Sequence, residues 1–199
     1  MRDKEKFIQA RLNMLGHKLV IDGDIGPKTK YALQKEGMAG TVEEILHKIL
    51  PYYKEKHELP WMDLGRRLIG IHEKTDNKFL RKWMASDGST VGDPANNPWC
   101  GDFVETCIKL SLPNEPVPEN PYLAYNWLKW GKATTPKEGA IMVFWRGAKQ
   151  SWKGHIGFYL GETVRTYRIM GGNQNNQVSI ASYSKLKLRP GGCRWPVTA

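Results

Sequence analysis

Three polar residues in the second half of the chain could together support nucleophilic catalysis. Cys100 begins the segment WCGDFVETCIKLS, in which apolar residues recur at helical spacing. Its thiol is therefore expected at the first turn of a helix. There the helix dipole and unpaired amides stabilise a thiolate and can donate to an oxyanion. The sequence predicts Cys100 as a candidate nucleophile; the alternative is a small buried apolar residue, the commoner state of a lone cysteine.

A nucleophilic thiol needs a base and a group that orients the base. His155 opens the strand-like segment GHIGFYLGE, and flanking glycines leave room for close approach. Asn173 follows two glycines after the next strand-like run, where its amide oxygen could accept from the imidazole and select a tautomer. Gln174 is the alternative for that role. A structural histidine and an ordinary Asn-rich turn remain the other interpretations.

The remaining cysteines receive no chemical role. Cys107 lies one heptad after Cys100 among apolar residues and is expected in the core, whereas Cys193 is placed in a Gly-Gly-Cys turn. Three cysteines do not make a disulfide framework, and no spacing typical of a zinc site occurs. We therefore expect neither a metal nor another cofactor.

The elements that must position these residues indicate an α+β fold, with helices first and a mostly antiparallel sheet after them. A capping box formed by Thr41 and Glu44 predicts the start of the third helix, and the polar segment from Tyr52 to Pro60 is interpreted as a linker. Expected helices include 4–15, 42–50, 79–84 and 100–108, and expected strands are 140–145, 155–160, 164–170 and 178–181.

Composition narrows the choice of partner without deciding it. The net charge is +10, and 19 basic against 11 acidic residues follow residue 58, compared with 11 against 9 up to that residue. A basic surface favours an anionic partner such as nucleic acid, acidic lipid or a bacterial cell wall. No apolar run approaches the roughly 20 residues of a membrane helix, and the N-terminus lacks a secretory h-region. We expect no membrane insertion.

Taken together, WCGDFV, the strand after Gly139-Ala140, GHIGFYLG and GGNQ resemble the papain-like peptidoglycan hydrolases of the CHAP group, with NlpC-type peptidases as neighbours. The likeness covers residues 60–196. It implies that Cys100 is the nucleophile, His155 the base and Asn173 the orienting residue. Many CHAP domains have a glutamate two positions before the asparagine, where this chain has Gly171, so the third member stays open between Asn173 and Gln174.

The N-terminal part resembles a second family. LVIDGDIGPKTKYALQK is similar to the D-G-x-x-G-x-x-T core of the three-helix peptidoglycan-binding domain. The resemblance implies that Asp22, Gly23, Gly26 and Thr29 belong to a wall-binding element. Two independent segments thus point to the same polymer.

These observations predict a small three-helix bundle at residues 1–58, followed by a papain-like domain at residues 59–199. The expected protein is a monomeric, endolysin-like hydrolase that binds peptidoglycan and not nucleic acid. It would be made in the cytoplasm without a signal peptide and act on the wall after release. Asn97 is expected to help hold the oxyanion, and three tryptophans to line the cleft: Trp99, Trp145 and Trp152.

Several alternatives stay open at this point. The bond cut could be the muramoyl–alanine amide or one within the peptide part, because the same cysteine–histidine chemistry serves both. A peptidase that acts on proteins would use the same machinery. A non-catalytic protein that binds cell wall or nucleic acid through its basic surface is the alternative from another class.

Overall fold

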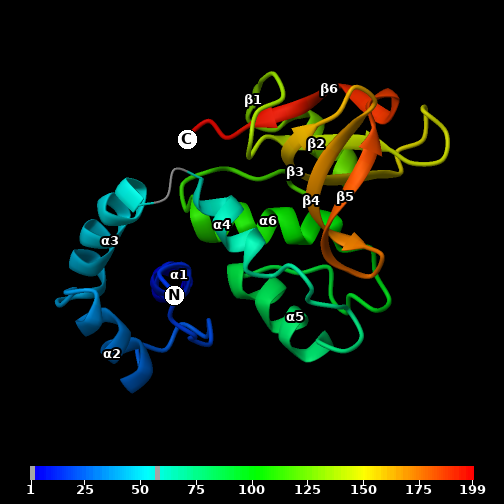
Figure 1. Cartoon of the computed structure of the whole chain (residues 1–199). Coiled ribbons are helices and arrows are strands. Elements are labelled where there is room, and N and C mark those ends of the chain that lie inside the picture. The colour runs from blue at the N-terminus through cyan, green and yellow to red at the C-terminus, as the bar shows by residue number, and fades with distance from the viewer. Residues whose placement is uncertain (1–2, 57–58) are drawn as a thin grey trace.

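The structure, a computed structural model, describes residues 3–56 and 59–199 and has a mixed helical and antiparallel architecture, which confirms the α+β class. Figure 1 shows α1–α3 at one side, the sheet at the other, α4 and α6 between them, and α5 below α6. The helices are α1 (Asp3–Met14), α2 (Pro27–Lys35), α3 (Val42–Lys56), α4 (Pro60–Arg66), α5 (Asn77–Met84) and α6 (Cys100–Ser111), with 3-10 turns η1 (Ala85–Asp87), η2 (Ala124–Lys129) and η3 (Lys185–Lys187).

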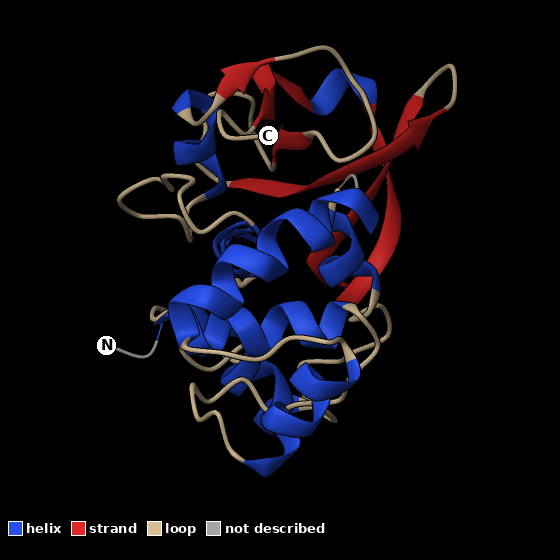
Figure 2. Ribbon diagram, turned by 90° about the vertical axis from the view of Figure 1, so that its left-hand side faces the viewer, coloured by secondary structure: helices blue, strands red, loops and turns tan. Residues whose placement is uncertain are grey.

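The six strands form one antiparallel sheet in the order β1-β6-β2-β3-β4-β5. They are β1 (Lys132–Ala133), β2 (Ile141–Trp145), β3 (Gly154–Glu162), β4 (Thr166–Gln174), β5 (Gln177–Ser184) and β6 (Leu188–Trp195). In Figure 2 the strands gather at one end of the molecule and most helices at the other. The strands β2 to β5 follow one another as neighbours, so the β3–β4 pair that bears the candidate site lies inside the sheet.

Strand β6 corrects the expected turn at Cys193. That residue stands opposite Met142 in the ladder between β6 and β2, and its side chain is buried. The ladder shifts register between Met142 and Phe144, and the shift accommodates the extra residues around Pro190 in β6. Proline has no amide hydrogen to donate to a ladder, so it fits at such an irregularity. Pro190 and two glycines hid this strand from the sequence pattern.

The helical N-terminal segment agrees with its capping signals but not with the predicted linker. Gly16 follows α1 with a φ of 104°, the left-handed conformation expected of a C-terminal glycine. The Thr41 amide donates to Glu44 Oε2 at 2.7 Å and the Glu44 amide to Thr41 Oγ1 at 3.3 Å, which forms the predicted capping box. However, α3 continues to Lys56, so the first part of the supposed linker is helical. Residue 58, the predicted boundary, lies outside the described residues.

Two hydrophobic clusters share helix α1. Phe7, Ile8 and Leu12 pack with residues of α2 and α3, whereas Ala10 belongs to the larger cluster built from α4–α6 and the sheet. The buried guanidinium of Arg11 donates to the carbonyl of Ser111 at the end of α6. Helix α1 therefore holds the N-terminal helices against the element that carries Cys100.

Helix α6 packs directly on β3 and β4 and so brings Cys100 to the sheet. Phe103 of α6 lies 6.1 Å from Phe158 of β3, measured between ring centroids. A Cβ at Gly172 would come within 2.4 Å of the buried Trp99 ring. Only a glycine in β4 permits this approach. Within the ranges described here, no helix is long and apolar enough to span a bilayer.

Candidate functional site

The Cys100 thiol lies where α6 begins and is almost fully enclosed. Cys100 is the first residue of the helix and is 4% exposed. Backbone amides of Cys100, Gly101 and Ile156 interact with its sulfur and favour the thiolate, but burial outweighs them and raises the pKa of the thiol. The packing that places the sulfur at the helix terminus also removes water from it, and this desolvation opposes the predicted stabilisation of a thiolate.

His155 of β3 is also buried, and its tautomer follows from one hydrogen bond. The ring Nε2 lies 3.1 Å from Oε1 of Gln174, at the end of β4. The side-chain amide nitrogen of Gln174 donates to the carbonyls of Ile169 and Ser179. The side-chain oxygen of Gln174 is therefore the atom that faces the imidazole ring of His155. An amide oxygen can only accept, so His155 Nε2 carries the hydrogen and Nδ1 holds the basic lone pair.

Gln174, and not Asn173, makes this contact. The ladder between β4 and β5 changes register between Gly171 and Gln174, and Asn173 has a φ of 55°. This irregularity interrupts the alternation of the strand and brings Gln174, not Asn173, to the imidazole. Asn173 was expected to accept from the imidazole, and this expectation is corrected. Gln174, which was the predicted alternative, makes this hydrogen bond. A Cβ at Gly171 would lie 3.4 Å from His155 Nε2, so that position also borders the ring.

Tyr183 of β5 covers one face of the imidazole. The two rings are stacked, with centroids 4.8 Å apart and planes at 7°, and Phe144 of β2 stacks on Tyr183 at 4.9 Å. Burial raises the pKa of Tyr183 to about 12, and the negative charge of an ionised Cys100 adds to that rise. The phenol thus shares one neighbourhood with the imidazole and the thiol.

The strand β3 links the two candidate reactive groups. The amide that meets the Cys100 sulfur belongs to Ile156, the residue directly after His155. Within the described part of the chain no hydrogen bond joins the thiol to the imidazole. Hydrogen bonds between reacting groups are often long before substrate binds.

The other predicted site residues differ in their access to a substrate. Trp99 is fully buried, with its indole donating to Glu73 Oε2 at 2.9 Å, so its predicted place in the cleft is corrected to a core position. Asn97 directs its side-chain amide to the carbonyl of Asp93 at 3.0 Å. Trp145 is partly buried, whereas Trp152 is 62% exposed on the loop between β2 and β3.

Asp102 connects the start of α6 to the preceding loop, and the sequence pattern did not identify it. Its buried carboxylate accepts from the Val91 amide at 2.7 Å and from Thr90 Oγ1 at 3.1 Å. These bonds tie the loop that precedes Cys100 to the first turn of α6. Burial raises the pKa of Asp102 to about 6 despite these bonds. An aspartate in the first turn of a predicted helix was the available signal.

The D-G-x-x-G-x-x-T segment forms a turn held from inside by Gln9 of α1. Gln9 donates to Asp22 Oδ1 at 2.8 Å and accepts from the Gly23 amide at 2.7 Å. It also lies 3.4 Å from Thr29 Oγ1, while Gly26 precedes Pro27 at the start of α2. These contacts give Asp22, Gly23, Gly26 and Thr29 a structural part in the loop. A wall-binding role for them stays a prediction.

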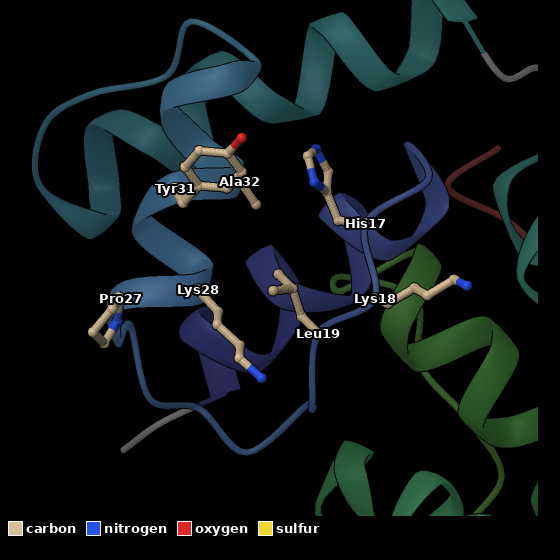
Figure 3. A pocket seen from close by; sticks show the side chains of 7 residues that line it. All are labelled: His17, Lys18, Leu19, Pro27, Lys28, Tyr31 and Ala32. Carbon is tan, nitrogen blue, oxygen red and sulfur yellow. The ribbon is translucent and has the colours of Figure 1, made fainter.

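A shallow depression of about 380 Å³ lies beside this turn (Figure 3). Tyr31 presents an aromatic ring that is 60% exposed, and His17 is held by Glu36 at 3.0 Å from Nε2 to Oε1. An exposed aromatic ring can stack on the apolar face of a ligand, and neighbouring cations and hydrogen-bonding groups can bind its polar groups. The lining residues are His17, Lys18, Leu19, Pro27, Lys28, Tyr31 and Ala32.

Comparison of the chain with protein-family models, curated proteins and solved structures found no match. The family resemblance therefore stands on the residues alone. Over residues 3–56 and 59–199, no group of three or more His, Cys, Asp or Glu side chains is arranged to hold a metal ion.

The buried imidazole leads to a pH prediction. Burial lowers the pKa of His155 to about 4; the hydrogen bond with Gln174 opposes this shift and the nearby charge of Arg146 adds to it. The base is then neutral above that pH, so hydrolysis should keep its acidic limb near pH 4 and not near 6.5. The pH profile of kcat/KM on a soluble peptide substrate measures this limb, and a half-loss near pH 6.5 would contradict it.

The same shift affects stability with a defined sign. Between pH 4 and 6.5 the folded state binds fewer protons at His155 than the unfolded state does. Its contribution to the free energy of unfolding is therefore complete above pH 6.5 and is lost as the pH falls towards 4. Asp87, whose pKa burial raises to about 7, acts in the opposite direction over the whole of this window. The activity profile is therefore the cleaner measurement.

Proposed function

We propose that this protein is a peptidoglycan hydrolase that cleaves an amide bond in the peptide part of the polymer by cysteine–histidine catalysis. The observation that carries the proposal is the hydrogen bond from His155 Nε2 to Gln174 Oε1. It leaves Nδ1 as a base on the strand whose next amide meets the Cys100 sulfur. A helix that begins at a cysteine and packs on an antiparallel sheet with such a histidine suits a papain-like catalytic domain.

The chemistry follows from these atoms. His155 Nδ1 takes the proton of the Cys100 thiol as the sulfur attacks the scissile carbonyl. Amides at the start of α6 stabilise the oxyanion that forms. The imidazolium then gives its proton to the departing amine, and a thioester remains on Cys100. Water, deprotonated by the neutral imidazole, attacks the thioester and releases the acid and the free thiol.

Burial of both groups fits a general-base mechanism. Burial raises the thiol pKa and lowers the imidazole pKa, and both shifts favour the neutral forms of the resting pair. The proton moves only as the sulfur attacks, and the charges that develop are stabilised by the amides at α6 and by the Gln174 oxygen. The reaction then needs no resting ion pair.

The N-terminal helices are proposed to be a wall-binding module. Their hydrophobic cluster is separate from the main one, and the depression beside the Gln9-held turn offers a ligand surface. Peptidoglycan carries carboxylates, and the net charge of +10 favours such a polymer. An endolysin-like monomer made in the cytoplasm and acting on the wall after release agrees with this proposal.

The decisive experiment is mass spectrometry of fragments released from purified peptidoglycan. We expect new amino termini at one amide bond, which also identifies the bond. Incubation with the Cys100→Ala variant is the matched control and should release none. Intact peptidoglycan after prolonged incubation with well-folded wild-type protein would overturn the proposed function.

A binding prediction concerns Tyr31. The Tyr31→Ala variant should bind insoluble peptidoglycan roughly three- to tenfold more weakly, because it loses an exposed stacking surface without disturbing the core. Co-sedimentation measures the affinity. The control is Tyr125→Ala, which removes an exposed tyrosine from η2 in the other part of the chain. Equal loss in both variants would argue against the depression as the binding surface.

A further inference from the structure

The loop between β2 and β3 is strongly basic and lies beside the candidate base. Residues 146–153 contain Arg146, Lys149 and Lys153, and no acidic residue occurs between Glu138 and Glu162. Trp152 on the same loop is 62% exposed. Arg189 of β6 donates to the carbonyls of Lys149, Ser151 and Lys153 and so fixes the loop to the sheet. The loop is thus a held, cationic element.

The register of the sheet determines which of these cations is closest to the candidate site. Phe144 of β2 stands directly opposite His155 of β3. The Arg146 amide donates to the Lys153 carbonyl at 3.0 Å, which extends the same ladder beyond the last paired residues. Arg146 therefore follows Phe144 on the face that His155 occupies. His155 is 2% exposed, whereas Arg146 is exposed. The Arg146 side chain is therefore nearer to solvent than the buried side chains of Cys100 and His155.

The electrostatics agree with this placement. The positive charge of Arg146 helps to lower the pKa of His155. The same charge opposes the rise in pKa that burial causes at Cys100 and at Tyr183. Such a contribution to three groups requires that the guanidinium be near all of them. Among the residues described, Arg146 has no acidic partner within ion-pair distance, whereas Arg66 and Lys185 each pair with a glutamate. The Arg146 guanidinium is therefore available to bind an anionic group of a substrate.

We propose that Arg146 is a specificity-determining residue that binds a carboxylate carried by the peptide substrate next to the scissile amide. This inference rests on the proposed function and names its substrate class: peptides with a free carboxylate flanking the bond that is cut. Arginine suits this task because its planar guanidinium donates two parallel hydrogen bonds to one carboxylate. Binding there would also hold the scissile carbonyl near Cys100.

The test compares two peptide substrates that differ only in this group, one with the carboxylate and one with the corresponding carboxamide. Wild-type protein should cleave the carboxylate peptide with a kcat/KM roughly ten- to a hundredfold higher, as expected when a charge-assisted bidentate contact is lost. Arg146→Ala should remove this preference, so that the kcat/KM values of the carboxylate and carboxamide peptides fall within about threefold of each other. Arg146→Lys should restore part of the preference.

Lys149→Ala is the matched control, because it removes one positive charge from the same loop outside the ladder in which Arg146 pairs with Lys153. It should leave the preference for the carboxylate peptide unchanged. Equal loss of preference in Lys149→Ala and Arg146→Ala would overturn the inference in favour of a diffuse charge effect. Equal cleavage of both peptides by wild-type protein would overturn it while the proposed function stands. Failure of wild-type protein to cleave either peptide or peptidoglycan would overturn both.

Discussion

The Cys100→Ala variant is expected to lose peptidoglycan hydrolysis by a factor on the order of 10⁴ or more, while its fold and its binding to the polymer stay intact. Removal of a nucleophile in a catalytic unit costs about as much as removal of the whole unit. Alanine fills most of the space of the buried thiol, so the loss of stability should be small. Release of soluble fragments measures activity, and circular dichroism together with co-sedimentation checks fold and binding.

Cys107 supplies the internal control for this experiment. It lies two helical turns along α6, is fully buried, and has a pKa raised well above the ordinary value by burial. Cys107→Ser should lower the free energy of unfolding by about 1–2 kcal/mol, because a hydroxyl is placed in an apolar site, and should keep the chemistry. Full lysis by Cys100→Ala, or loss of catalysis in a folded Cys107→Ser protein, would show that the wrong thiol has been assigned.

Replacement of Gln174 by leucine should reduce kcat by roughly tenfold to a thousandfold with a smaller change in KM. The substitution removes the oxygen that holds the Nε2–H tautomer of His155, so the ring can rotate or present the wrong nitrogen. The size of the loss reflects positioning and not removal of the base. Kinetics on a soluble peptide substrate separate kcat from KM.

The matched control is Asn173→Gly, which keeps the left-handed backbone at that position and removes the side chain first predicted for the role. It should stay within about threefold of wild type. Nitrogen-15 NMR of the imidazole provides a readout that general destabilisation would not produce: an Nε2–H tautomer in the wild type and a mixture in Gln174→Leu. A larger loss in Asn173→Gly than in Gln174→Leu would reverse the assignment.

Local patterns in the chain were sufficient for much of the fold. The helical spacing after Cys100 predicted α6 and placed the thiol at its first residue, and the alternation after His155 predicted β3. The capping box at Thr41 and Glu44 also formed as expected. Each of these features depends on residues within a few positions of one another, which is why the pattern can be recognised without knowledge of the fold.

Features that depend on partners distant in the chain were not accessible in this way. Strand β6 pairs with β2 across some fifty residues and accommodates Pro190 only because the ladder shifts there. The continuation of α3 to Lys56 is a local feature, and it was missed for another reason: a polar segment and a nearby proline suggested a linker. In both cases, local composition favoured a break and the observed backbone continued its regular structure.

The sequence by itself determined the residue types that make this chemistry possible: a cysteine at a helix start, a histidine on a strand, and amides after the next strand. Only the tertiary structure decided which amide meets the imidazole, since a change of register selects Gln174. Only the tertiary structure also decided that the thiol is buried, which raises its pKa, and that the charge of Arg146 acts on it. The physical reason is that desolvation and charge act through space, across distances set by packing and not by position along the chain.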